Sequence, residues 1–540
     1  MKLSALAADV PHRRAGSPGD PEVLAVTHDS RAAAPGTLFA ALPGLKADGR
    51  HFVADAVARG AVAALGLAPG PAAASVPYLE VENPRRSAGL MAALLAGRPS
   101  EKLVMVGVTG TSGKTTTTYL LEGLLAGRHR MRGFFGTIVY RGVGGHASAI
   151  ASPHTTPEAT ELQPMLQALA ADGGTAAIME CSSHALVLER LAGCAFDVAV
   201  FLNLSREHLD FHRDMDDYFE AKTRLFGLLK PNGKAVVNLG DEYGMRLASR
   251  LVADRTVGFF LEGEEGSAAE GGAVAAANAA AGGFFATVIG RATLSTTGTR
   301  LDVEVSSSSP FKEKNTLTLA PLKVEKNGQP KALLTVNSPL LGRPNAENLL
   351  AAAAAGLALG LSPAEISEGL GAVASVPGRL ELVPNALGLT VLVDYAHKPA
   401  ALEGVLKTVR TIAAASGGRV IAVFGCGGDR DKGKRPEMGR IAALLADEVV
   451  VTSDNPRSED PEAILQDVRA GVEAAGKTAR YVVDRREALA EAFSRARAGD
   501  VVLVAGKGHE TVQVVRGGEL PFDDRLVARA LLEERARAAR

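Results

Sequence analysis

The chain has 540 residues, a formal net charge of −1, 46% hydrophobic and 22% charged residues, which is typical of a soluble globular protein of about three domains. The balanced charge argues against nucleic acid or an anionic membrane surface as a partner, and no apolar stretch reaches the roughly 18–20 residues of a membrane span, so we expect no membrane insertion. The three cysteines have no metal-type spacing, which argues against a disulfide framework and predicts a cytoplasmic protein.

The first part of the chain, residues 1–98, is predicted to form a small α/β domain. It contains the motif Asp29-Ser-Arg31 and a short apolar strand at residues 38–41, and it ends at the linker Gly97-Arg-Pro-Ser100. Beyond the linker, helical patterns alternate with short apolar runs at residues 103–108, 176–179 and 198–203. Such alternation predicts a mostly parallel sheet.

A central domain is assigned to residues 99–340, with an insertion near residues 262–336 that has no predicted role. Residues 263–283 are rich in Gly, Ala, Ser and Glu, as in a flexible loop. Residues 293–305 and 315–336 alternate like antiparallel strands.

The last part of the chain, residues 341–540, is predicted to form a third α/β domain. Its apolar runs predict strands at residues 391–393, 420–424, 449–452, 481–483 and 501–505. We expect the alanine run 351–355 to lie in an amphipathic helix and the arginine-rich residues 535–540 to end a solvated helix.

A glycine-rich turn follows the first strand of the central domain and leads into a lysine and two threonines. Backbone N–H groups of such a turn, with those that begin the next helix, form a nest for anions. The lysine adds a charge at the outer phosphates, and a threonine hydroxyl can ligate Mg²⁺. The usual phosphate loop has glycine where this chain has Val108, and the glycine lies one residue earlier. The segment predicts a triphosphate site, rather than an ordinary turn, at Gly110, Thr111, Ser112, Gly113, Lys114, Thr115 and Thr116.

Polar groups also follow the next two predicted strands. Glu180-Cys-Ser-Ser-His184 follows one, and Asn203-Leu-Ser-Arg-Glu-His208-Leu-Asp210 follows the other. Ligands of open parallel sheets bind outside the carboxyl ends of the strands, so a lysine, a carboxylate and an imidazole should surround one crevice. With phosphate oxygens, Glu180 and His208 suit Mg²⁺ or Mn²⁺ better than zinc, although either residue alone would more often be structural.

Four motifs occur in order along the chain, and with them it closely resembles the Mur ligase family of ATP-dependent amide-bond synthetases. The motifs are Thr109-Gly-Thr-Ser-Gly-Lys-Thr-Thr116, Glu180-x-Ser-Ser-His184, Asn203-Leu-Ser-Arg-x-His-Leu-Asp210 and Asp394-Tyr-Ala-His397-x-Pro399. The resemblance covers essentially the whole chain and includes the displaced glycine. It implies an α/β fold of three domains: a small α/β UDP-binding domain, a central P-loop domain with a parallel sheet, and a C-terminal Rossmann-like domain.

Within the family, the chain most resembles the members that add the third residue to UDP-N-acetylmuramoyl-L-alanyl-D-glutamate. The resemblance implies that ATP activates a carboxylate as an acyl phosphate, which an amine then attacks. It assigns Lys114 to the β- and γ-phosphates, Thr115 to one Mg²⁺, and Glu180 and His208 to a second. Lys222, which sequence alone would place on a helix surface, matches the lysine that the family carbamylates to N6-carboxylysine, an anion that can help to bind metal.

Substrate contacts are also implied by the resemblance. Ser30 and Arg31 match the uridine-binding stretch, although a plain turn is an equal interpretation without the family. A second contact loop matches Leu45, Lys46 and Ala47. The muramoyl-dipeptide contacts match Thr155, Thr156, Ser182 and Arg190. The sequence departs from the family pattern at His154, where asparagine is common, and at Leu188, where glutamine is expected.

For the nucleotide, Gly342-Arg-Pro-Asn-Ala-Glu-Asn348 resembles the family's linker motif, with Pro344 in place of the usual aromatic residue. The match assigns Asn348 to adenine, Arg379 to phosphate and Asp394 to ribose. Without the family, Asp394 would be a cap at a strand end.

The amino acid to be added is predicted from the third domain. Asp454-Asn455-Pro456-Arg457 resembles the signature of members that add meso-diaminopimelate, whose distal head carries both a carboxylate and an ammonium. An arginine fork pairs with a carboxylate, and acidic side chains suit an ammonium. L-Lysine lacks the distal carboxylate and would leave a buried arginine unpaired. The predicted site consists of Arg430, Asp454, Asn455, Pro456, Arg457, Gly506 and Glu510.

Several alternatives are weighed against this prediction. One is the same ligase with L-lysine as its substrate, and another is a ligase like folylpolyglutamate synthetase, which the motifs at Asp29 and Asp454 disfavour. A mechanical or regulatory P-loop NTPase would hydrolyse ATP without an amine acceptor. A catalytically inactive binding module is disfavoured by the presence of Lys114, Glu180, His208 and Lys222. A monomer is expected.

Overall fold

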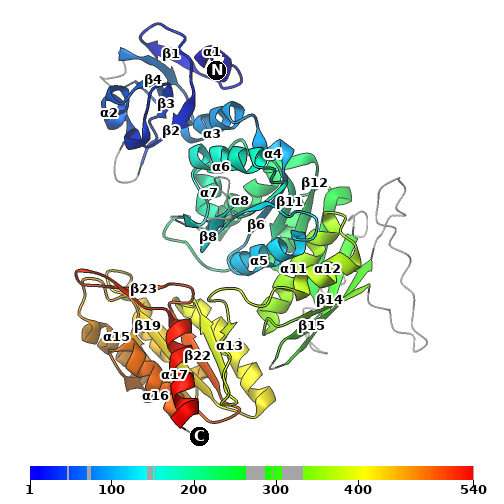
Figure 1. The fold of residues 1–540 in the computed structure, drawn as a ribbon, viewed down its shortest axis with the longest axis vertical. Coiled ribbons are helices and arrows are strands. Elements are labelled where there is room, and N and C mark those ends of the chain that lie inside the picture. The colour runs from blue at the N-terminus through cyan, green and yellow to red at the C-terminus, as the bar shows by residue number, and fades with distance from the viewer. Residues whose placement is uncertain are drawn as a thin grey trace. The chain divides into compact units, whose positions relative to one another are not determined.

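The computed structural model describes residues 1–44, 48–69, 75–142, 150–152, 154–262, 286–295, 297–306 and 333–538. Within these residues, helices alternate along the chain with the strands of four sheets, one of them a two-stranded hairpin, so the predicted α/β class is confirmed (Figure 1). The chain divides into two compact units. The first unit is Met1–Gly290, Val303–Leu334 and Leu350–Gly369, and the second is Arg291–Asp302, Thr335–Leu349 and Leu370–Arg540. The domain boundaries after residues 98 and 340 stay predictions.

The first unit begins with a five-stranded sheet. Its order is β1 (Arg13–Gly16), β5 (Pro77–Glu80), β4 (Ala61–Gly66), β3 (Thr37–Ala40) and β2 (Ala25–Thr27). All neighbours are parallel except β1 and β5. The accompanying helices are α1 (Leu3–Leu6), η1 (Ser30–Ala32), η2 (Gly49–Phe52), α2 (Val53–Ala58) and α3 (Pro84–Leu95).

The central sheet carries the phosphate loop. From one edge to the other it contains β9 (Ile150–Ala151), β8 (Val139–Arg141), β7 (Arg132–Phe135), β10 (Ala176–Glu180), β6 (Val104–Thr109), β11 (Phe196–Phe201), β12 (Leu229–Asn238), β13 (Thr256–Leu261), β14 (Ala286–Leu294), β15 (Thr299–Ser306) and β16 (Leu334–Ser338). In this sheet order, β7, β10, β6, β11, β12, β13 and β14 are parallel to one another. Because β6 lies between β10 and β11, the three predicted strand ends meet at one edge of the sheet.

Several helices precede, connect or follow these strands along the chain. They are α4 (Pro99–Lys102), α5 (Lys114–Leu125), α6 (Ala159–Ala171), α7 (Ser183–Val187), α8 (Met215–Thr223), η4 (Arg224–Leu228), α9 (Glu242–Ala248), η5 (Ala253–Arg255), α11 (Arg343–Ala358) and α12 (Pro363–Gly371). The strand β6 is buried at five of its six positions, as the apolar run predicts for a central strand. Among the described helices, none has both the length and the apolar character of a membrane span.

The second unit contains a six-stranded sheet and a hairpin. The sheet order is β17 (Glu381–Leu382), β18 (Thr390–Asp394), β22 (Val501–Ala505), β19 (Val420–Cys426), β20 (Glu448–Ser453) and β21 (Arg480–Tyr481). The hairpin is β23 (Val512–Val515) and β24 (Gly518–Pro521), and the helices are α13 (Pro399–Ser416), α14 (Lys434–Leu445), α15 (Pro461–Ala474), α16 (Arg485–Arg495) and α17 (Asp524–Ala538).

Alternate residues of this sheet belong to two different cores. Leu392, Phe424 and Val451 pack with α13, α14 and α15 on one face. Val393, Val423 and Val450 pack with α16 and α17 on the other. Helices therefore cover both faces, as in a doubly wound sheet (Figure 1). Since β18, β22, β19 and β20 are parallel, the residues that follow these strands share the carboxyl edge of the sheet.

Two expectations from the sequence need correction. The five alanines 351–355 are all fully buried, so their helix is enclosed on every side there rather than amphipathic. The C-terminal helix is not simply solvated, because Arg535 donates to the backbone carbonyls of Phe493 and Ala496 at the end of α16. The predicted loop at residues 263–283, and most of 315–336, lie outside the described residues.

Candidate active site

The predicted phosphate loop connects β6 to α5. Gly113 caps the helix with φ of +84°, a left-handed conformation that glycine adopts without a Cβ penalty. Lys114 begins the helix, and its Nζ donates to the backbone carbonyls of Gly110 at 2.9 Å and Thr111 at 3.0 Å. The loop thus holds a lysine ammonium over its own backbone, at the start of a twelve-residue helix whose N-terminus favours anions.

The segment after β11 holds this loop in place. Asn203 accepts from the Ser112 N–H through Oδ1 at 2.9 Å and donates to the Ser112 carbonyl through Nδ2 at 3.3 Å. The Thr111 hydroxyl lies 3.2 Å from the Tyr218 hydroxyl and accepts from the Ser205 N–H at 3.0 Å. The segment that begins at Asn203 therefore contacts the loop directly, through residues other than the predicted ligand His208.

Glu180 is fully buried at the end of β10, beside the loop. Its Oε1 accepts from the Thr115 hydroxyl at 3.0 Å and from the Thr137 N–H at 2.8 Å, and its Oε2 accepts from the Thr137 hydroxyl at 3.0 Å. The structure thus brings Glu180 and Thr115 together. Both supply oxygen donors of the kind that Mg²⁺ prefers.

His208 lies beside the rings of His184 and Tyr218, and its backbone has a φ of +57°. Its ring centroid is 4.9 Å from that of His184 and 5.9 Å from that of Tyr218. Within the described residues, no three His, Cys, Asp or Glu side chains are arranged to hold a metal ion. Glu180 and His208 therefore do not belong to a larger cluster of such side chains in the part of the chain that the structure describes.

Lys222 is the remaining candidate in this area, and it is buried rather than on the helix surface that sequence alone would predict. Its Nζ donates to the Gly110 carbonyl at 2.7 Å, so both predicted lysines meet the same carbonyl oxygen. Burial, followed by the positive charge of Lys114, lowers the pKa of Lys222 well below its usual value. Its amine is consequently easier to deprotonate than that of an exposed lysine.

The predicted muramoyl-dipeptide residues form a hydrogen-bonded group beside Glu180. The Thr155 hydroxyl lies 3.2 Å from that of Thr137, and the Thr156 hydroxyl donates to the Glu180 carbonyl at 2.7 Å. Ser182 donates its N–H to the Thr156 hydroxyl at 3.3 Å. Arg190 donates to the Thr156 carbonyl at 3.1 Å.

Arg190 is also held by a carboxylate that the sequence did not single out. Its Nε lies 2.9 Å from Glu158, whose other oxygen accepts from Arg85 at 3.3 Å. All three side chains are largely buried. Arg190 therefore lies between the Glu158 carboxylate, with which it forms an ion pair, and the Thr156 carbonyl, to which it donates.

The predicted uridine contacts are only partly described. Ser30 begins η1, where the Asp29 carboxylate accepts from the Arg31 N–H at 2.9 Å and pairs with its guanidinium at 2.8 Å. These contacts form a turn around Ser30. Leu45, Lys46 and Ala47 lie outside the described residues.

The second unit holds the residues predicted for adenine, phosphate and ribose. Asn348 is buried in α11 and donates to Asn345 at 3.5 Å. The Arg379 guanidinium lies 5.1 Å from the centroid of the Tyr395 ring. Asp394 accepts from the N–H groups of Leu380 and Ala396, each at 2.8 Å, as a cap at the end of β18.

The residues predicted for diaminopimelate follow β19, β20 and β22, whose carboxyl ends are neighbours. Asn455 donates to the Glu510 carboxylate at 2.8 Å, which joins two motifs 55 residues apart in the sequence. Arg457 donates to the Gly428 carbonyl at 2.9 Å. Gly506 has φ of +117°, and a Cβ there would lie 3.2 Å from the Asp454 carboxylate. Arg430 is exposed.

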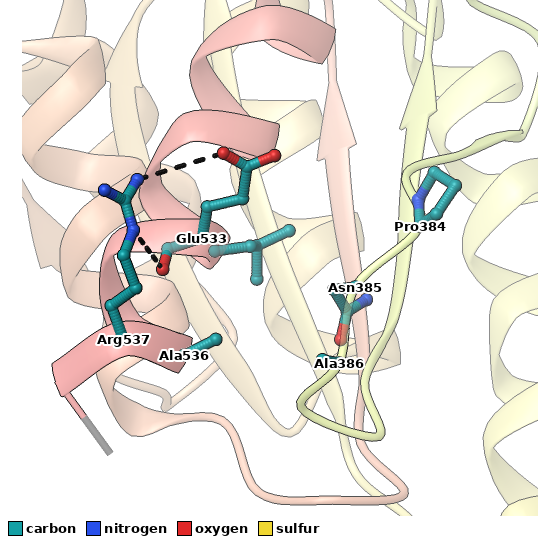
Figure 2. A pocket seen from close by; sticks show the side chains of 7 residues that line it. Pro384, Asn385, Ala386, Glu533, Ala536 and Arg537 are labelled. Carbon is teal, nitrogen blue, oxygen red and sulfur yellow. Dashed lines mark hydrogen bonds and ion pairs between the residues drawn. The ribbon is translucent and has the colours of Figure 1, made fainter. Parts of the chain in front are cut away.

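One pocket of the second unit lies away from these predicted residues. Figure 2 shows Pro384, Asn385 and Ala386 facing the last turns of α17, where Glu533 and Arg537 interact with each other. None of the residues that line this pocket belongs to a predicted site. It is therefore not a candidate for the chemistry.

Comparison with known proteins decides the family. Residues 22–95 match the model of the Mur ligase family catalytic domain, residues 108–356 the Mur ligase middle domain, and residues 378–508 the Mur ligase glutamate ligase domain. The chain belongs to the Mur ligase family. A relative from Streptomyces avermitilis named UDP-N-acetylmuramoyl-L-alanyl-D-glutamate--2,6-diaminopimelate ligase is 44% identical, over 95% of this chain and 93% of the relative.

Other Mur ligases agree with this result. A relative of the same name from Geobacter metallireducens is 41% identical over 99% of both chains. A solved structure of a ligase with that name has a TM-score of 0.64 and 30% identity, and the match covers 99% of both chains. The predicted three-domain Mur ligase fold is thus confirmed over essentially the full length.

Some contacts in this Mur ligase were not predicted from the sequence. Thr137 binds both oxygens of Glu180, and Glu158 orients Arg190. A sequence signal for Thr137 exists, because the apolar run at residues 133–135 predicts a further strand that ends in Gly136-Thr137. Lys507, between two predicted site residues, also escaped prediction.

Proposed function

We propose that this ATP-dependent Mur ligase adds meso-2,6-diaminopimelate to the D-glutamate of UDP-N-acetylmuramoyl-L-alanyl-D-glutamate, a step in peptidoglycan precursor synthesis. The observation that carries the proposal is the hydrogen bond between Asn455 and Glu510, beside Asp454 and Arg457. It joins the signature loop to the acidic residue after β22 in one site. The 44% and 41% identical relatives of that name support the same substrate.

The charges of this site suit the distal head of diaminopimelate. Asp454 and Glu510 provide negative charge for an ammonium, and the Arg457 guanidinium can pair with a carboxylate through two N–H groups. Arg430 is the second proposed carboxylate contact. L-Lysine would offer an ammonium but leave the arginines without their anion, which disfavours it.

At the other end of the reaction, the phosphate loop would bind ATP through its N–H groups and through Lys114. The D-glutamate carboxylate attacks the γ-phosphorus, the bond to the β-phosphate oxygen breaks, and ADP leaves. The amine of diaminopimelate then attacks the acyl carbon, loses a proton and expels phosphate. The contribution of the chain is to orient these groups: Lys114 at the phosphates, and Thr155, Thr156, Ser182 and Arg190 at the dipeptide.

The donor set near Glu180 fits Mg²⁺. The Thr115 hydroxyl would ligate one Mg²⁺, and the Glu180 carboxylate and the His208 imidazole would hold a second. Thr115 and Glu180 are already in contact. Bound Mg²⁺ would neutralise the negative charge of the phosphate oxygens. The contacts from Thr137 would keep the Glu180 carboxylate oriented towards it.

We propose that Lys222 is carbamylated, which would supply a second anion that can help to bind metal. A neutral amine is required, because its lone pair attacks the carbon of CO₂ while the amine proton is released to solvent. The burial of Lys222 and its lowered pKa favour this neutral form. The carbamate would then replace an ammonium that now binds the Gly110 carbonyl.

The remaining parts of the proposal concern the other substrate contacts and the state of the protein. Ser30, with residues 45–47, would bind the uridine, and Asn348, Arg379 and Asp394 would bind adenosine and its phosphates. The protein would act as a cytoplasmic monomer. The cysteines in the described part of the chain, Cys181, Cys194 and Cys426, are all free thiols, which fits a reducing compartment.

One assay tests the proposal. ADP release is measured with UDP-N-acetylmuramoyl-L-alanyl-D-glutamate and a panel of amino acids. We expect release that requires meso-diaminopimelate and is far slower with L-lysine. Equal rates with both would overturn the assignment, and ADP release without any amine would indicate a P-loop NTPase instead. ADP release that requires folate and glutamate would favour the folylpolyglutamate synthetase alternative.

A further inference from the structure

Lys507 is the most completely enclosed charged group of the proposed amino-acid site. Its side chain is 0% exposed, and its Nζ donates to three oxygens: Asn455 Oδ1 at 3.1 Å, Glu510 Oε2 at 3.1 Å and the Val512 carbonyl at 2.6 Å. A buried ammonium is stable only when it is paired and fully hydrogen-bonded, and all three of its protons have acceptors here.

These bonds fix two proposed substrate contacts at once. Asn455 Oδ1 accepts from Lys507 and from the Val514 N–H at 2.9 Å, so its amide nitrogen must point the other way, towards Glu510. Glu510 Oε2 accepts from both Lys507 and Asn455. The ammonium therefore sets the orientation of the Asn455 amide and engages one oxygen of the Glu510 carboxylate.

Lys507 also contributes to the charge of the site. Its Nζ lies 4.0 Å from Asp454 Oδ1, a buried atom that has no hydrogen-bond partner among the described residues. Burial raises the pKa of Asp454, and the positive charges of Arg485 and Lys507 oppose that rise. Arg485 is already paired with Asp524, so Lys507 is the cation that Asp454 and Glu510 share, and it offsets one of their two negative charges.

We propose that Lys507 is a positioning and specificity residue, whose buried ammonium orients Asn455 and Glu510 and sets the charge of the site to favour a zwitterionic head over a lone ammonium. The inference rests on the proposed function of this site. With the cation present, an incoming head needs both a carboxylate for the arginine and an ammonium for the remaining negative charge. Without it, the surplus negative charge would attract the side-chain ammonium of L-lysine.

Two variants remove the charge of Lys507, and they differ in whether the side chain can still donate hydrogen bonds. Lys507→Gln removes the charge but keeps an amide that can donate hydrogen bonds, and Lys507→Met removes both. Lys230→Met is the matched control, since the Lys230 Nζ also donates to a carboxylate, Asp197, at 2.7 Å and to a backbone carbonyl, Leu103, at 2.8 Å, but lies in the first unit. Circular dichroism of each full-length variant verifies that it is folded.

The readout is the KM for diaminopimelate and the ratio of kcat/KM for diaminopimelate to that for L-lysine. We expect both Lys507 variants to raise the KM about tenfold or more and to lower the ratio about tenfold, because a unit charge near two carboxylates is removed. The KM values for ATP and the UDP-linked substrate should stay within about twofold, as they should in Lys230→Met.

The outcomes distinguish this inference from the proposed function. If the wild-type chain shows no diaminopimelate-dependent ADP release, the proposed function fails. If the wild type uses diaminopimelate but folded Lys507 variants keep its KM and the lysine ratio, only the inference fails. A fall in kcat alone in the Lys507 variants would indicate a general structural role and would also overturn the inference. So would a change in Lys230→Met equal to theirs in the KM and in the lysine ratio. If the Lys507 variants do not fold, Asn455→Asp is measured instead. It adds negative charge beside Lys507 and should lower the ratio of kcat/KM for diaminopimelate to that for L-lysine.

Discussion

The ion pair between Arg485 and Asp524 lies in the interior of the second unit, and its contribution to the stability of that unit can be tested by substitution. Both side chains are 0% exposed, and two N–H groups of the arginine meet the two carboxylate oxygens, each at 2.7 Å. The same guanidinium donates to the carbonyls of Ser453 and Ala505 at 3.1 Å. Those residues end β20 and β22, directly before Asp454 and Gly506. We predict that Asp524→Asn destabilises this unit strongly.

The magnitude follows from burial. Removing one partner of a fully buried pair leaves the other charge uncompensated, at a cost of about 3–5 kcal/mol. For a unit of about 200 residues, each kcal/mol lowers the Tm by roughly 2–4 °C, so the expected loss is about 6–20 °C. Arg485→Met should cost at least as much, because it also leaves two strand-end carbonyls without their donor.

The neighbouring residue provides a matched control. Arg486 pairs with Glu534 at 3.1 Å between the same two helices, but their side chains are 49% and 56% exposed. Glu534→Gln should therefore change stability by at most about 1 kcal/mol. Calorimetry and circular dichroism of the full-length variants, at one fixed scan rate, give the comparison. If Asp524→Asn lowers the Tm no more than Glu534→Gln does, the argument from burial is refuted.

Three further predictions concern the first unit. Lys222→Ala should lower kcat at least about 100-fold and regain activity with short carboxylic acids, and full activity without rescue would contradict carbamylation. Thr137→Val should lower kcat about tenfold and raise the Mg²⁺ concentration for half-maximal rate, since Glu180 loses a hydroxyl donor; an unchanged metal dependence would exclude that role. Glu158→Gln should raise the KM for the UDP-linked substrate several-fold with little change in kcat, because Arg190 loses its ion pair; a change confined to kcat would count against it.

Much of the fold could be predicted because it depends on local apolar patterns. The runs at residues 103–108, 420–424 and 501–505 became β6, β19 and β22 within two residues at each end. These are central strands with both faces covered, so nearly every position is apolar. The short edge strand β21 was less well placed, since edge strands carry fewer buried residues.

The candidate site was predictable where it follows a strand. Lys114 follows the loop after β6 and Glu180 ends β10, and these two strands are parallel neighbours in the central sheet, so their carboxyl ends lie together. Asp454 directly follows β20 in the separate sheet of the second unit. Contacts across the sequence were not predictable in the same way. The pairing of Glu158 with Arg190, or of Lys507 with Asn455, depends on which loops fold over the sheet edge, and no local pattern specifies that.

The two ends of the proposed reaction use their cations differently. Lys114 and Lys222 both donate to the backbone carbonyl of Gly110, which carries no net charge, so a bound phosphate would offer Lys114 an attraction between opposite charges that this carbonyl does not. Lys507 and Arg485 are already enclosed with carboxylates, and moving either would leave a buried charge unpaired. In the proposed reaction, Lys114 and Lys222 would therefore respond to ATP and CO₂, whereas Lys507 would be a fixed charge against which the incoming amino acid is selected.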